Sequence, residues 1–172
     1  YFGDHIWCDE WEFPKRFDLS AITIDPSKGK KNGDYSSIGL AGVSGGKVWL
    51  WPDIARRPHE EIARDAVTMY ERFAPDWVGL ETNSFQHLMK PLIDQECAAR
   101  NMIPPPITEI YNLADKDLRI GRLGPYLRDR KFRICRQAPG AQLLFQQLRE
   151  WGVAERRDGP DQTEMAIRLI QE

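Results

Sequence analysis

Three acidic side chains stand at the ends of predicted elements, although they are far apart in the sequence. Asp25 ends the first apolar run, Glu81 ends a later run of the same kind, and Asp161 opens the last predicted helix close to Asp158. Strand ends and helix N-termini gather at one edge of an α/β sheet, so these carboxylates can meet there. Clustered carboxylates raise each other's pKa unless a cation neutralises them, and oxygen ligands without histidine or cysteine suit Mg²⁺ or Mn²⁺.

Two such ions about 3.5–4 Å apart would activate a water molecule and stabilise the leaving oxygen of a phosphodiester. The spacing alone leaves a second interpretation open, since acids that follow strands also cap helices or solvate loops.

The three cysteines, Cys8, Cys97 and Cys135, form no CxxC pair or cysteine and histidine cluster, so a structural zinc site is not expected. We interpret them as reduced, intracellular thiols.

The elements that must position these acids alternate between strand and helix. Residues 19–25, 35–43 and 47–54 form three apolar or β-branched runs separated by turn residues, which predicts three antiparallel strands. Helical spacing begins at Pro58, which suits a first helical position. The further predictions are strands at 77–81 and 107–111, a short edge strand or extended segment at 132–135, and helices at 58–73, 84–100, 115–130, 141–151 and 161–171. This order predicts a mixed sheet flanked by helices.

The length of 172 residues fits one domain, and 41% hydrophobic with 29% charged residues is typical of a globular chain. No apolar stretch is long enough to cross a bilayer, and the N-terminus lacks the pattern of a signal peptide. The net charge of -2 hides an asymmetry, because residues 115–157 carry +6 and the remainder -8. Such a basic segment can engage phosphates, or it can be a solvated helical face.

Four sequence segments, in order, resemble the C-terminal nuclease domain of tailed-phage terminase large subunits. They are IDPSKGKKNGDYSSI, VGLETNSFQ, ADKDLRIGRLGPYLRDRKFRI and DGPDQTEMAI, and the resemblance covers residues 19–172. It implies an RNase H-like α/β fold and an endonuclease that cuts double-stranded DNA with little sequence specificity during genome packaging. It also implies catalysis with Mg²⁺ or Mn²⁺, with two ions expected.

The resemblance assigns roles residue by residue. It makes Asp25 the first metal ligand, Glu81 the second and Asp161 the third, with Asp158 a further ligand and Asp34 an accessory acid. The last motif departs from the family, because Arg156 and Arg157 stand where a histidine and an acid are common, and Gln162 stands where the family has alanine. Which of Asp158 and Asp161 is the principal ligand is therefore left open.

Basic residues near these acids are candidates for DNA contact. Lys28, Lys30 and Lys31 lie in a loop between Asp25 and Asp34, where they either grip the DNA backbone or only solubilise the loop. Lys116 and Arg119 begin a predicted helix that lies beside the site in the resembling family. No recognition-helix or zinc-finger pattern is present, so the contacts are expected to position DNA without reading its sequence.

The resemblance also suggests partners. Residues 1–18 are expected to be a linker from an ATPase domain that is not in this chain, and residues 19–172 the nuclease domain. The sequence contains no GxxxxGK[ST] phosphate loop, so no ATP hydrolysis is expected. The implied partners are double-stranded DNA, the ATPase domain, the small terminase subunit and the portal, in the cytoplasm of an infected bacterium and without a membrane.

Two other functions fit the same sequence. A Holliday-junction resolvase or integrase-like nuclease uses similar carboxylates. A non-catalytic DNA-binding module of the packaging complex would accommodate the altered last motif.

Overall fold

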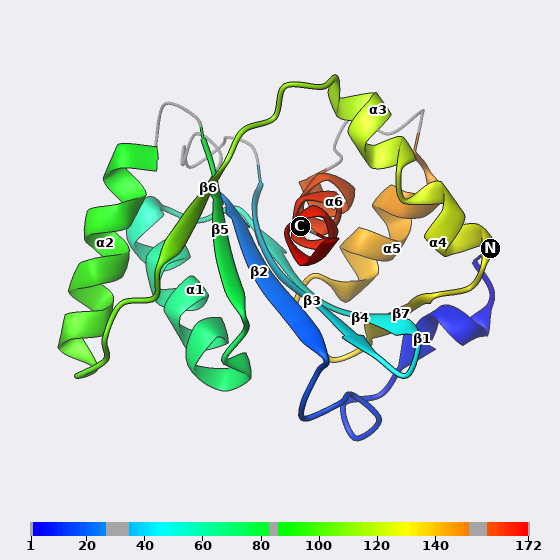
Figure 1. Ribbon diagram of the computed structural model, residues 1–172, viewed down its shortest axis with the longest axis horizontal. Helices are drawn as coiled ribbons and strands as arrows, with labels where there is room; N and C mark the ends of the chain where they lie inside the picture. The colour runs from blue at the N-terminus through cyan, green and yellow to red at the C-terminus, as the bar shows by residue number, and fades with distance from the viewer. Residues whose placement is uncertain (1, 27–34, 83–85, 152–157, 172) are drawn as a thin grey trace.

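The structure is a computed structural model that describes residues 2–26, 35–82, 86–151 and 158–171 (Figure 1). Its centre is a seven-stranded mixed sheet with the strand order β1-β7-β4-β3-β2-β5-β6. The strands are β1 (Trp7–Cys8), β2 (Leu19–Asp25), β3 (Ser36–Ser44), β4 (Lys47–Ala55), β5 (Trp77–Glu81), β6 (Ile107–Ile110) and β7 (Phe132–Cys135).

The three strands predicted as an antiparallel series pair as expected. β2 pairs with β3 and β3 with β4, both antiparallel, and Gly45 and Gly46 turn the second hairpin with φ values of 60° and 72°. Glycine adopts these angles without the steric cost that a Cβ would add. β5, β6 and β7 then join in parallel with their neighbours β2, β5 and β4, as strands returning through helical crossovers do.

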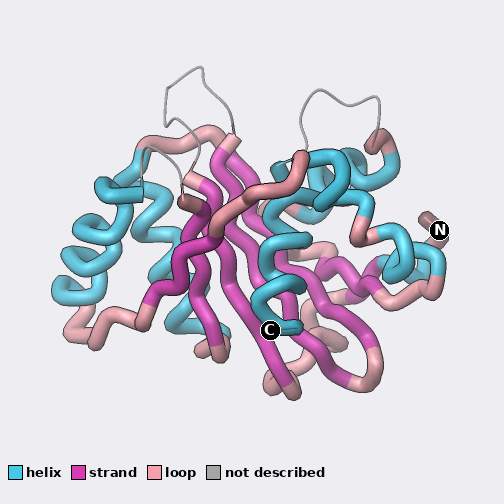
Figure 2. Tube along the Cα trace, turned by 45° about the horizontal axis from the view of Figure 1, so that its top comes forward, coloured by secondary structure: helices cyan, strands magenta, loops and turns pink. Residues whose placement is uncertain are grey.

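Helices cover both faces of this sheet (Figures 1 and 2). α1 and α2 pack together on one face, while α6 lies across β2 and β3 on the other and contacts α5. The helices are η1, a short 3-10 helix (Asp4–Ile6), α1 (His59–Phe73), α2 (Gln86–Ala99), α3 (Lys116–Gly121), α4 (Gly124–Arg128), α5 (Ala141–Arg149) and α6 (Asp158–Gln171). Within the described ranges, no helix is both long and apolar enough to cross a membrane.

The N-terminal segment contributes to the sheet, which sequence analysis did not predict. Trp7 and Cys8 form β1 and pair in parallel with Ile134 and Cys135 of β7. β7 therefore has a neighbour on each side, and its prediction as an edge strand is wrong. Two residues are too few to show the alternation that identifies a strand in a sequence. The origin of residues 1–18 as a linker stays a prediction.

Aromatic side chains of the same segment pack on the sheet. The Phe13 ring lies 5.8 Å from the Trp51 ring and 5.9 Å from the Phe73 ring, centroid to centroid. This cluster joins the N-terminal segment to β4 and to the end of α1. Cys8, Cys97 and Cys135 are buried free thiols, and burial raises the pKa of Cys8 to about 12.

The predicted single helix over residues 115–130 is wrong, because the structure has two short helices there. α3 ends at Gly121, and α4 begins at Gly124 with Pro125 in its first turn. Glycine lowers helix propensity, and proline has no N–H to donate to the preceding turn. The break leaves Lys116 and Arg119 on a helix of their own.

Candidate metal centre

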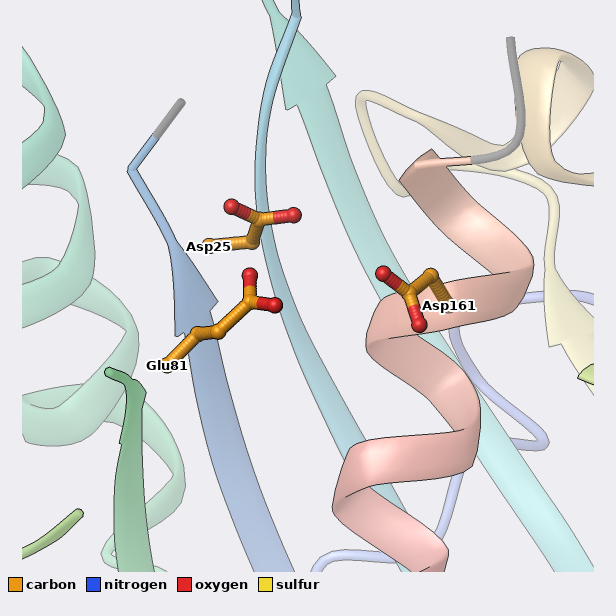
Figure 3. A group of neighbouring side chains, drawn as sticks. All are labelled: Asp25, Glu81 and Asp161. Atoms are coloured by element: carbon orange, nitrogen blue, oxygen red, sulfur yellow. The ribbon is translucent and has the colours of Figure 1, made fainter. Parts of the chain in front are cut away.

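Asp25, Glu81 and Asp161 converge on one point of the structure (Figure 3). Each offers a carboxylate oxygen, and these oxygens all lie within 4.8 Å of one another. Figure 3 shows the carboxylates of Asp25 and Glu81 side by side, with that of Asp161 facing them from α6. Acids separated by up to 136 positions in the sequence therefore form one cluster.

Strand register explains why the first two acids meet. β2 and β5 are parallel neighbours, and Ile24 pairs with Leu80, so the next residues, Asp25 and Glu81, end their strands side by side. The side chains project from the same edge of the sheet, as expected where parallel strands end.

Gln162 fixes the third acid by tying α6 to the sheet. Its side-chain amide donates to the Thr23 hydroxyl at 2.7 Å and to the Gly39 carbonyl at 3.0 Å. The Thr23 hydroxyl in turn donates to the Gln162 carbonyl at 3.0 Å. Gly39 leaves the space that the glutamine fills, since a Cβ there would overlap the Gln162 amide. Gln162, the departure from the family pattern, thus anchors the helical turn that carries Asp161.

The cluster is electrostatically costly without a cation. Burial raises the pKa of Asp25 well above its ordinary value, and the charges of Glu81, Asp161 and Asp158 together with a hydrogen bond to Glu81 add to the shift. Burial also raises the pKa of Asp161, although Lys116 and Arg119 act in the opposite direction. Neutral carboxyls and bound cations are the two ways to relieve such a cluster.

Basic side chains contact Asp161 directly. Arg119 donates from Nη1 to Asp161 Oδ1, and Lys116 Nζ lies 3.6 Å from Oδ2. Arg119 is only 5% exposed, whereas the Lys116 side chain is 36% exposed. Of the two, Lys116 is thus the more accessible to a phosphate, and DNA contact by either residue stays a prediction.

Three polar residues next to the cluster were not predicted from the sequence. Asn112 donates to Glu81 Oε1 at 2.6 Å, and Arg168 donates to Asn112 Oδ1 at 2.6 Å. Arg168 also pairs at 3.2 Å with Glu164, which is buried one helical turn beyond Asp161. The spacing of 161, 164 and 168 places these residues on one face of a helix, which is the signal that could have identified Glu164 and Arg168.

The remaining predicted site residues fall in two groups. Asp158 lies half-buried in the first turn of α6, near enough to contribute to the raised pKa of Asp25. Asp34, Lys28, Lys30 and Lys31 lie outside the described residues, as do Arg156 and Arg157.

The chain is similar in structure to several solved nuclease domains. No protein-family model and no curated protein matches the chain. The large terminase nuclease from thermophilic phage G20c with bound zinc matches with a TM-score of 0.61 and 14% identity over 87% of this chain and 80% of that one. The same nuclease with bound magnesium gives 0.58 and 13% over 89% and 83%. The nuclease domain of the large terminase subunit gp2 of bacterial virus Sf6 gives 0.51 and 14% over 84% and 76%.

The chain has the RNase H-like fold of these nuclease domains. The fold class expected from the sequence, a mixed sheet with three antiparallel strands first and flanking helices, is thereby confirmed.

Within this RNase H-like frame, the donor set fits a hard divalent cation. Among the residues that the structure describes, the cluster consists of three carboxylates and contains no histidine or cysteine, and Mg²⁺ and Mn²⁺ prefer such oxygen ligands. Asp25 has its charge disfavoured by burial and by the other acids, which is the environment that a divalent ion reverses. Asp25, Glu81 and Asp161 are the residues that would hold it.

Proposed function

We propose that this chain is a divalent-metal-dependent endonuclease that hydrolyses double-stranded DNA during phage genome packaging, as the nuclease domain of a terminase large subunit. The observation that carries the proposal is the meeting of Asp25, Glu81 and Asp161 within 4.8 Å. The fold shared with phage terminase nucleases supports the same activity. The role of a metal ion when bound is to activate water and neutralise charge on the phosphodiester.

The chain's own residues supply position and charge. The three carboxylates are fixed on two strands and one helix, so little rearrangement is needed to bind a cation. Asn112 holds one oxygen of Glu81 by a hydrogen bond of 2.6 Å, which restrains this carboxylate beside the other two. Lys116, partly exposed beside Asp161, is placed to contact a phosphate oxygen of DNA.

The wider assignments follow from the same proposal. Two ions of Mg²⁺ or Mn²⁺ serve the reaction, with Asp158 as a further ligand and Asp34 as an accessory acid. Lys28, Lys30 and Lys31 grip the DNA backbone next to the cut. Residues 1–18 connect to an ATPase domain that hydrolyses ATP in place of this chain, and the small subunit and portal complete the assembly in the cytoplasm of the infected host.

A plasmid assay tests the activity. Supercoiled plasmid is incubated with the chain in Mn²⁺, in Mg²⁺ and in EDTA, and we expect nicked and linear products with metal only. Asp25→Ala should reduce cleavage by at least about 100-fold because it removes a ligand, the range seen when a group that stabilises the transition state is lost. Asp94→Ala is the matched control, since Asp94 is an exposed acid on α2.

Undiminished metal-dependent cleavage by Asp25→Ala would overturn the assignment. The same preparations are tested on a four-way junction and on linear duplex. A strong preference for the junction would favour a resolvase instead. Salt-sensitive DNA binding without cleavage in Mn²⁺ would indicate a non-catalytic module.

A further inference from the structure

Glu164 is a buried carboxylate that the proposed reaction does not use. It is 3% exposed and lies on α6, three residues after Asp161. Burying a charge without partners is costly, so a buried carboxylate next to a reaction site calls for a physical reason.

Three arginines surround Glu164. Arg168 lies 3.2 Å and Arg119 4.0 Å from Oε1, and Arg122 lies 3.8 Å from Oε2. Among the described residues Oε1 has no hydrogen-bond partner, although it is fully buried. Glu164 Oε1 is thus an acceptor without a hydrogen bond. Arg119 Nη1 would have to move about 1 Å closer to donate to it.

Arg119 reaches this acceptor with the same nitrogen that it gives to Asp161. Its Nη1 donates to Asp161 Oδ1 and lies 4.0 Å from Glu164 Oε1, while its Nε is held by the Ala114 carbonyl at 3.1 Å. A small rotation about the fixed Nε therefore moves Nη1 from one carboxylate to the other.

A divalent ion and Arg119 compete for Asp161, because each is a cation that uses the same carboxylate oxygens. If the ion displaced Arg119 into a buried space without an acceptor, a buried guanidinium would lose its carboxylate partner, which is strongly unfavourable. Glu164 removes this cost by offering a second carboxylate one helical turn away.

We propose that Glu164 is a positioning residue that accepts Arg119 when Asp161 binds a divalent ion. This inference rests on the proposed function, because it requires Asp161 to be a metal ligand. Arg168 completes the arrangement, since it pairs with Glu164 and, through Asn112, with Glu81. Arg168 thus connects Glu164 to Glu81 as well as holding it near Asp161.

A double-mutant cycle tests the exchange through Mn²⁺ affinity, measured by calorimetry in the absence of DNA. Glu164→Gln keeps the shape and removes the charge, so Arg119 stays on Asp161 and Mn²⁺ affinity falls about tenfold or more. Arg119→Gln should change affinity less than about threefold in the original chain and raise it about tenfold in the Glu164→Gln chain. The exchange of Arg119 between Asp161 and Glu164 requires that Arg119→Gln affects Mn²⁺ affinity differently in the two backgrounds.

Equal effects of Arg119→Gln in both backgrounds would overturn the exchange, since a general electrostatic influence of Glu164 is additive. Thermal unfolding in EDTA checks that each variant folds. If Glu164→Gln does not fold, Glu164→Asp, which keeps the charge on a shorter side chain, takes its place in the cycle, and Arg119→Gln should again raise Mn²⁺ affinity more in that background than in the original chain. Glu96→Gln is the matched control, because Glu96 pairs with Arg100 at 3.0 Å away from the cluster.

The outcomes separate the two proposals. An original chain that binds no Mn²⁺ overturns both of them. Mn²⁺ binding together with an additive cycle overturns the exchange alone and leaves the metal-dependent nuclease intact.

Discussion

Asp25 combines burial with the repulsion of neighbouring acids, so its charge serves binding at the expense of stability. We expect Asp25→Asn to raise the free energy of unfolding in EDTA on the order of 1–2 kcal/mol, as stabilising changes at strained functional sites do. The same variant should lose the stabilisation that Mn²⁺ gives to the original chain. Thermal and urea unfolding with Mn²⁺ or EDTA measure both effects.

The pH dependence of that gain has a definite sign. The folded pKa of Asp25 is raised above its unfolded value, so the metal-free protein loses stability as the pH rises from the unfolded pKa through the folded one. Asn does not titrate, and the advantage of Asp25→Asn should therefore grow with pH and be smallest in acid. An advantage that shrinks as the pH rises would contradict the raised pKa.

At the level of residues, the sequence indicated the ligands better than the groups that hold them. Asp25 and Glu81 end β-branched or apolar strands, and that position predicts a shared sheet edge. Asn112 gave no such signal, and the helical spacing of Glu164 from Asp161 indicates a shared face but not burial, since charged and amide side chains are mostly exposed. Glu164 is buried where α3 packs against α6 and Arg119 faces it, and this contact between distant segments has no local pattern in the sequence.

At the scale of elements, Gly39 and Gln162 decide how closely α6 approaches β3. We expect Gly39→Ala to destabilise the fold by about 1–3 kcal/mol, because the new methyl group overlaps the Gln162 amide. Gln162→Ala should compensate for part of this loss, so that the double variant is more stable than the two single effects predict. Urea unfolding of the four chains gives the coupling energy.

Measuring Mn²⁺ affinity distinguishes the loss of the contact between Gly39 and Gln162 from a general destabilisation of β3. Displacement of α6 moves Asp161, so Gly39→Ala should also weaken Mn²⁺ binding. Gly42→Ala is the matched control, because a Cβ at Gly42 would meet the Phe17 ring instead of α6. Equal loss of Mn²⁺ affinity in both variants would show that the packing of α6 on Gly39 is not what places Asp161.

The elements whose prediction failed share a physical cause. β1 has two residues, and it is a strand only because β7 offers it an edge. The helix predicted over residues 115–130 has suitable apolar spacing, but Gly121 and Pro125 divide it. Periodicity detects long elements that bury one face, whereas short elements depend on tertiary neighbours that the local sequence does not contain.

For the whole molecule, the fold places the basic segment of the sequence on one side of the sheet. Residues 115–151, the described part of the basic segment, carry nine basic and four acidic side chains. They include α3, α4, β7 and α5, which lie together on one side of the sheet's centre, whereas α1 and α2 lie on the other (Figure 1). DNA bound at the metal centre should therefore extend toward α3 and α4, because phosphates gain most from that side.

Salt dependence tests this direction. Each phosphate contact contributes about 0.9 to the slope of log binding constant against log salt, so Arg128→Gln on α4 should lower the slope by about 1. Arg100→Gln removes the same charge at the end of α2 and should leave it unchanged. Both arginines pair with an acid, Asp129 at 3.3 Å and Glu96 at 3.0 Å, although Arg100 also pairs with Glu71 and is less exposed than Arg128. Binding of short duplex DNA in EDTA, followed by fluorescence anisotropy over a range of NaCl, gives both slopes; equal slopes in the two variants would mean that DNA does not follow the basic side.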